Sequence, residues 1–104
     1  MKFGLDQNTI DKFCKVFATY PEIEEVIIYG SRAKGNFREG SDIDITLKGQ
    51  GVSEEIRKKV WLDLDGLNTP YLIDLSIFHL LNSESLSDHI DRVGKRFYYC
   101  ADSF

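Results

Sequence analysis

Apolar residues recur at helical spacing in three segments of the chain. The first segment follows Asn8, which can cap a helix, and continues to about residue 20. The second follows the cap residue Ser53, and the third begins near Ser83 and ends at Gly94. The three apolar stripes are Ile10, Phe13, Cys14 and Phe17; Ile56, Val60, Leu64 and Leu67; and Leu86, Ile90 and Val93.

Three other segments, residues 24–29, 42–48 and 71–78, have the composition of strands. Side chains alternate between the two faces of a strand. In the segment 42–48, Ile43, Ile45 and Leu47 therefore share one face. The acids Asp42 and Asp44 share the other face. The segment 71–78 has the same phase. Strands that alternate with helices predict an α/β fold. We expect one domain over residues 1–104, with a mixed sheet of three or four strands packed with helices.

Three aspartates fall in phase on two of the predicted strands. Asp42 and Asp44 share one face of the first, and Asp74 lies on the equivalent face of the second. Pairing of the strands would bring three carboxylates together, and burying them without partners would be costly. Such a cluster requires cations, and carboxylate oxygens suit magnesium or manganese. Without metal, the acids would repel one another and raise at least one pKa. Two alternatives stay open: a single aspartate at a strand end is often a solvated turn residue, and an aspartate–arginine network could be structural.

The segment before the acids has the features of a strand-to-helix phosphate turn. Gly30 permits close approach of the backbone, and Ser31 adds a hydroxyl donor beside the amides of a short helical turn. Arg32 and Lys34 place positive charge nearby. The segment is not a P-loop, because Asn36-Phe37 stands where that motif requires Lys and then Ser or Thr. A dinucleotide-binding fingerprint is also absent from the sequence.

A known signature resembles the arrangement of these residues. Residues 30–44 run from Gly-Ser through ten residues to Asp-x-Asp, as in the DNA polymerase beta-type nucleotidyltransferase superfamily, and they most resemble the small minimal nucleotidyltransferases. The resemblance implies that Asp42 and Asp44 are ligands of two magnesium ions and that Asp74 is the third carboxylate of the catalytic set. It also implies the nucleotidyltransferase fold.

The same resemblance implies a nucleotide and a partner. Gly30 and Ser31 would grip the triphosphate, and we add Arg32 and Lys34 to the nucleotide-binding set because of the positive charge that they place nearby. Proteins of this kind commonly act as antitoxins beside a small helical HEPN-domain toxin, to which they transfer AMP from ATP at a tyrosine hydroxyl. The preference for adenine is inherited from the resemblance, because phosphates and metal ions do not discriminate between bases.

Charge and cysteine content limit the cellular setting. The net charge of −4 and the pI near 5.1 argue against a general nucleic-acid-binding protein, which needs clustered Lys and Arg. Cys14 and Cys100 form no close pair, and no secretory leader is recognised, so we expect a cytoplasmic protein. The apolar runs are too short to span a bilayer, so we expect no membrane partner. The oligomeric state stays open, and a homo-oligomer is compatible with the sequence.

Several other residues invite a functional interpretation. We assign Trp61 to the core of its helix rather than to base stacking. His79 and His89 lie on different elements without ligand spacing, so we assign them structural or surface roles. The aromatic residues at 97–99 could form a last strand or remain exposed as a docking surface, and both interpretations stay open.

Two functional alternatives accompany the nucleotidyltransferase hypothesis. A binding module could keep the carboxylates and yet neutralise a partner by covering it, without catalysis. A small-molecule transferase, such as one that modifies an aminoglycoside, would normally need an acceptor-binding domain, for which 104 residues leave no room. We therefore expect a protein acceptor whose surface completes the site.

Overall fold

Four strands form one mixed sheet in the computed structural model, which describes residues 3–38 and 40–100. The elements are α1 (Gln7–Ala18), β1 (Glu25–Tyr29), α2 (Gly30–Lys34), β2 (Ile43–Lys48), α3 (Glu54–Asp65), β3 (Ile73–Ile77), the 3-10 helix η1 (Phe78–Leu80), α4 (Glu84–Val93) and β4 (Lys95–Tyr99). The strand order is β3-β2-β1-β4. Only β2 and β3 are parallel, joined by the crossover helix α3, and the other pairs are antiparallel. This arrangement confirms the predicted α/β fold with a mixed sheet.

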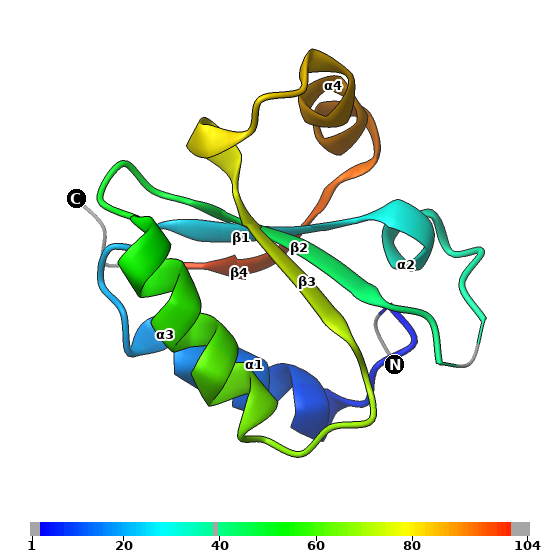
Figure 1. Cartoon of the computed structure of the whole chain (residues 1–104). Helices are drawn as coiled ribbons and strands as arrows, with labels where there is room; N and C mark the ends of the chain where they lie inside the picture. Colours follow the sequence, from blue (N-terminus) through cyan, green and yellow to red (C-terminus); the bar gives the residue numbers. More distant parts are fainter. Residues whose placement is uncertain (1–2, 39, 101–104) are drawn as a thin grey trace.

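The helices cover the sheet on both faces. Figure 1 shows α1 and α3 together on one face, with α4 and η1 on the opposite face. The larger apolar cluster includes Phe13 and Phe17 of α1, Val60 and Leu64 of α3, and Ile43, Ile45 and Leu47 of β2. A smaller cluster on the other face includes Ile27, Tyr29 and Ile90. The polar side chains of β2 therefore face away from the main core, as the alternating pattern predicted.

The structure confirms one of the two helix caps predicted from the sequence. The hydroxyl of Ser53 accepts a hydrogen bond at the start of α3, as predicted, and α4 begins directly after Ser83, whose hydroxyl also caps its helix. The prediction that Asn8 caps the first helix is wrong, because α1 begins two residues earlier. The cap is Asp6, whose carboxylate accepts a hydrogen bond from the Thr9 amide at 2.8 Å.

Two aromatic features decide questions that the sequence raised. The interpretation of the tail as a last strand is confirmed, since β4 pairs with β1 and Phe97 packs on the rings of Phe13 and Phe17. The assignment of Trp61 to the core is wrong, because its side chain is 40% exposed. Trp61 follows the buried Val60, and one residue turns a helical side chain by about 100°, out of the apolar stripe.

No helix within the described residues is long and apolar enough to cross a membrane.

Candidate active site

One row of side chains crosses three strands on the α4 side of the sheet. Tyr29 of β1 is paired with Asp44 of β2, and Asp44 is paired with Asp74 of β3. Residues paired across neighbouring strands point to the same face, so the two carboxylates are direct neighbours. Asp42 lies immediately before β2 and is exposed. The structure therefore brings Asp44 and Asp74 together, with Asp42 two residues away along the chain.

The three carboxylates influence one another electrostatically. Burial raises the pKa of Asp44, and the negative charges of Asp74 and then Asp42 raise it further. A nearby histidine, His89, acts in the opposite direction. The expectation that crowding of the acids raises at least one carboxyl pKa in the absence of metal is confirmed at Asp44.

The donor chemistry of this row suits a hard divalent cation. A cation would relieve the repulsion that raises the pKa of Asp44, and its ligands would be carboxylate oxygens. Among residues 3–38 and 40–100, however, no group of three or more His, Cys, Asp or Glu side chains stands ready to hold a metal ion. The side chains are thus close enough to repel one another but are not arranged as a preformed ligand cluster.

The turn after β1 lies directly beside Asp44. Helix α2 starts at Gly30, whose φ is +73°, a conformation that L side chains rarely adopt. A Cβ atom at this position would lie 2.5 Å from Oδ2 of Asp44. Ser31 follows on the first turn of the helix and is partly buried. Glycine is therefore required here by both the backbone conformation and the space that Asp44 occupies.

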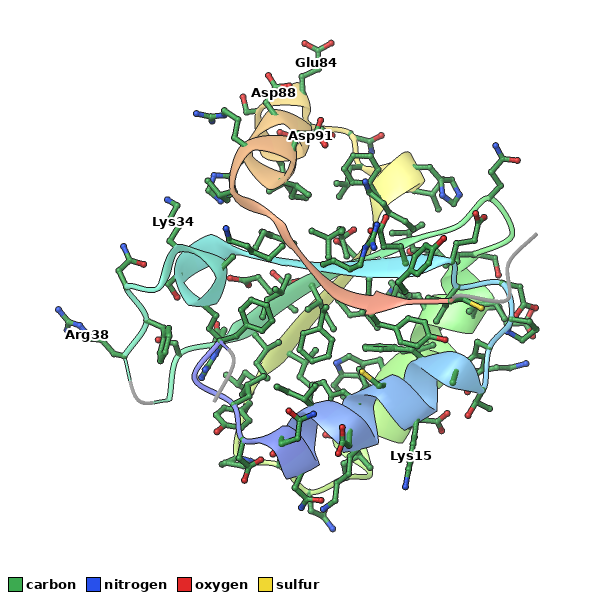
Figure 2. The ribbon with its side chains drawn as sticks, turned by 180° about the vertical axis from the view of Figure 1, so that it is seen from behind. Lys15, Lys34, Arg38, Glu84, Asp88 and Asp91 are labelled. Carbon is green, nitrogen blue, oxygen red and sulfur yellow. The ribbon has the colours of Figure 1, made fainter. Side chains whose placement is uncertain are left out.

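The basic residues near the turn separate into two groups. Lys34 ends α2 and is exposed, and Arg38 lies in the following loop; Figure 2 shows both projecting outward from the protein. Arg32 is buried, and its guanidinium donates hydrogen bonds to the carbonyl oxygens of Phe3 and Ser41. The prediction that Arg32 binds nucleotide finds no support in this geometry, because its side chain is turned into the interior.

Two further residues beside the acids were not assigned to the site from the sequence. The ring of Tyr29 meets that of His89 edge to face, with centroids 6.3 Å apart. Burial raises the pKa of Tyr29, a contact with the Ser76 hydroxyl opposes this, and the charges of Asp74 and then Asp44 add to the increase. His89 comes from α4, sixty residues from Tyr29 in the chain. The alternation of side chains along the strand could have indicated that Tyr29 lies beside the acids. Nothing in the sequence indicated that His89 lies there.

Solved structures with the same fold include several toxin–antitoxin complexes. A chain of a toxin–antitoxin crystal structure with AMP-PNP superimposes with a TM-score of 0.69 and 22% identity, over 93% of this chain and 76% of that one. A chain of the complex between the tri-AMPylated HEPN toxin of Shewanella oneidensis and its MNT antitoxin gives 0.68 and 19%, over 92% and 74%. A chain of the MntA–HepT complex gives 0.67 and 19%, over 91% and 74%. At these identities the likeness concerns the fold.

The sequence comparison identifies the family. A search of curated proteins gave no match. The family model described as "Polymerase beta, Nucleotidyltransferase" matches residues 11–103, which contain the phosphate turn and all three aspartates. This match covers most of the chain and agrees with the fold and with the row of carboxylates beside Gly30. The chain therefore belongs to the polymerase beta nucleotidyltransferase family.

Proposed function

We propose that this chain is a magnesium-dependent nucleotidyltransferase that transfers AMP from ATP to a tyrosine hydroxyl of a small HEPN-domain toxin, and thereby acts as its antitoxin. The observation that carries the proposal is the pairing of Asp44 with Asp74 beside the turn at Gly30. A carboxyl group whose pKa is raised by burial and by neighbouring carboxylates, as at Asp44, is common at functional sites. Membership of the polymerase beta family gives that cluster a reaction class.

Asp42, Asp44 and Asp74 would hold the divalent cations. When bound, two magnesium ions would neutralise the charge of the triphosphate and lower the pKa of the attacking hydroxyl; manganese could replace them. The carboxylates form no preassembled ligand cluster among the described residues, so holding a cation would require their side chains to reorient. Binding then costs side-chain order but removes the repulsion centred on Asp44.

Gly30, Ser31 and Lys34 would bind the triphosphate. Gly30 leaves the backbone unshielded by a side chain, and the hydroxyl of Ser31 can donate a hydrogen bond to a phosphate oxygen. The exposed ammonium of Lys34 stands at the end of the same short helix. Adenosine is proposed because related folds occur with AMP-PNP and with an AMPylated toxin.

The residues of the chain would act on the attacking hydroxyl and on the leaving pyrophosphate. The oxygen of the acceptor hydroxyl forms a bond to the α-phosphorus, the bond from that phosphorus to the bridging oxygen breaks, and pyrophosphate leaves. Asp74 is exposed on the edge strand β3, and in this proposal it would take the hydroxyl proton. Ser31 and Lys34 would orient the leaving phosphates, which keeps the reacting atoms aligned.

A protein acceptor is supported by the charge balance and by the structural neighbours. A net charge of −4 disfavours a nucleic-acid end as acceptor. Figure 2 shows Glu84, Asp88 and Asp91 on the outer side of α4, so the element that covers the active-site face of the sheet presents negative charge to solvent. Chains of similar fold occur in complexes with toxins, in one case a tri-AMPylated HEPN toxin.

Transfer of label from ATP tests the proposal. The chain, magnesium, α-phosphate-labelled ATP and a cognate HEPN-domain protein should give a labelled partner, and peptide mapping should place the label on tyrosine. Replacing Asp42 and Asp44 together by Asn should abolish labelling while the complex still assembles. Labelling that persists in this double variant would remove the acids from the reaction.

The same experiment tests a non-catalytic alternative. The lack of a preassembled metal-ligand cluster among residues 3–38 and 40–100 is the one observation that favours an antitoxin acting by coverage alone. That function predicts full neutralisation of the toxin by the double variant without nucleotide. Our proposal predicts that neutralisation requires ATP, magnesium and the intact acids.

A further inference from the structure

Arg32 is a buried cation in the middle of the phosphate turn. Its side chain is 3% exposed, and its hydrogen bonds go to backbone carbonyl oxygens. Nε and Nη2 both donate to the Ser41 carbonyl, at 3.2 and 2.8 Å, and Nη1 donates to the Phe3 carbonyl at 2.8 Å. Two segments that are 38 residues apart in the chain are thereby joined through one guanidinium.

Aromatic rings complete the environment of the guanidinium. Its central carbon lies 5.2 Å from the ring centroid of Phe37 and 4.9 Å from that of Tyr71. The ion pairs found among the described residues do not include Arg32. A desolvated charge is costly unless hydrogen bonds and ring faces replace water, and here three hydrogen bonds and two rings do so. We call Arg32 and these four partners, Phe3, Phe37, Ser41 and Tyr71, the arginine clamp.

The clamp fixes the backbone that leads to the acids. The Ser41 carbonyl belongs to the peptide plane that continues into Asp42, so holding that oxygen fixes the orientation of the plane. Ser41 is held further by two hydrogen bonds with Arg38: the Arg38 amide donates to its hydroxyl at 2.8 Å, and its own amide donates to the Arg38 carbonyl at 3.0 Å. Tyr71 lies three residues before Asp74, on the segment that enters β3.

The N-terminal segment closes the clamp. Gly4 has a φ of +74°, and a Cβ atom there would lie 2.3 Å from Cε2 of Phe37 and 2.9 Å from Nη1 of Arg32. Phe3 stacks on Phe97 of β4 at a centroid distance of 6.0 Å, which anchors the segment to the sheet. The space over the guanidinium is therefore filled by backbone, and a side chain at position 4 would have to displace the clamp.

We propose that Arg32 is a positioning residue for the transfer reaction: it holds the Ser41–Asp42 peptide and the Tyr71 segment so that Asp42 lies in register with Asp44 and Asp74. This inference rests on the proposed nucleotidyl transfer. It assigns Arg32 to the arrangement of the acids and leaves phosphate binding to the turn and Lys34. Disturbing the clamp should therefore affect cation binding and turnover more than the affinity for ATP.

Arg32→Lys tests this role, because lysine keeps the charge and loses the forked donors. The variant should bind Mn2+, measured by electron paramagnetic resonance without nucleotide, about 10- to 100-fold more weakly. The kcat for transfer should fall by a similar factor, on the order of 10- to 100-fold, and KM for ATP should stay within about 3-fold of the parent. A residue that bound phosphate would instead raise KM for ATP and leave Mn2+ affinity unchanged.

Gly4→Ala disturbs the arginine clamp through the N-terminal segment, because the new Cβ atom would meet Phe37 and Arg32. It should reproduce the loss of Mn2+ affinity, whereas Gly35→Ala should not, because Gly35 has a similar φ of +86° but open space at Cβ. If both clamp variants merely lower Tm and keep the parent Mn2+ affinity and kcat well below Tm, the inference is overturned. If the parent itself neither binds Mn2+ nor transfers AMP, the proposed function fails instead, so the two failures are distinguishable.

Discussion

Replacing Gly30 by alanine tests whether the phosphate turn and Asp44 form one site. The added Cβ atom would lie 2.5 Å from Oδ2 of Asp44, whereas an ordinary contact is at least 3.4 Å. The carboxylate would have to move by about 1 Å, and a misplacement of that size can cost about 100-fold in rate. Alanine at a φ of +73° also costs roughly 1–2 kcal/mol of folding free energy. We expect Tm to fall by roughly 4–15 °C.

Gly35→Ala separates the two effects of this substitution. Gly35 has a φ of +86°, so alanine there introduces similar backbone strain, but the described residues leave open space within 4 Å of the position that the new Cβ would take. Both variants should therefore lose similar stability without metal. Only Gly30→Ala should displace Asp44 and weaken the response to a cation.

Differential scanning fluorimetry with and without magnesium and ATP provides the assay. The parent and Gly35→Ala should show the same increase in Tm on adding magnesium and ATP, because a ligand that binds only the native state stabilises it. Gly30→Ala should show little or no increase. Equal ligand-induced shifts in all three proteins, or an equal loss in both variants, would refute the idea that Gly30 makes room for a functional Asp44.

Three further predictions concern the nucleotide, pH and the helix contacts. Ser31→Ala should weaken ATP binding by about 1–3 kcal/mol in a calorimetric titration, since one charge-assisted hydrogen bond is lost, and unchanged affinity would exclude Ser31 from the site. Burial and the neighbouring carboxylates raise the pKa of Asp44, so its protonation stabilises the metal-free fold, and this contribution is lost as pH rises through the raised pKa. Magnesium competes with the proton on Asp44, so in the parent the magnesium-induced increase in Tm should vanish as pH falls through the raised pKa of Asp44. Asp44→Asn should show neither this pH dependence of the magnesium effect nor the pH-dependent contribution to the stability of the metal-free fold. The Tyr20 hydroxyl donates a hydrogen bond to the Asp63 carboxylate at 2.5 Å, which raises the pKa of Tyr20 to about 12. Tyr20→Phe should therefore lower the free energy of unfolding by about 0.5–1.5 kcal/mol. This difference between the variant and the parent should persist to pH 10 and disappear as pH rises through 12.

The strand phase made most of the site predictable from the sequence. Side chains alternate with a period of two, so the apolar residues of β2 fixed which face its acids occupy. The same reasoning applied to Asp74 in β3. The direct pairing of Asp44 with Asp74 was harder to predict from the sequence, because it depends on the order of the strands and on the parallel direction of β2 and β3. Local pattern restricts each strand, but tertiary packing selects its neighbour.

Arg32 and Trp61 illustrate what local pattern cannot supply. Arg32 stands between glycines in a turn that looks exposed, and its burial depends on the Phe3 and Ser41 carbonyls, which carry no sequence signal. Trp61 is large and apolar, but its angular position on α3 directs it outward. The early start of α1 was equally hard to predict, because Asp6 and Asn8 are both of a residue type that caps helices well, and the structure has Asp6 as the cap.

Counting bound cations tests the central claim most directly, namely that the three aspartates and the Gly30 turn form one cation- and nucleotide-binding site. Mn2+ can be titrated by electron paramagnetic resonance in the presence of a non-hydrolysable ATP analogue. We predict two saturable ions for each parent chain and loss of both in the variant that carries Asp42→Asn and Asp44→Asn. No saturable Mn2+ in the parent, or the same number in the double variant, would contradict the claim.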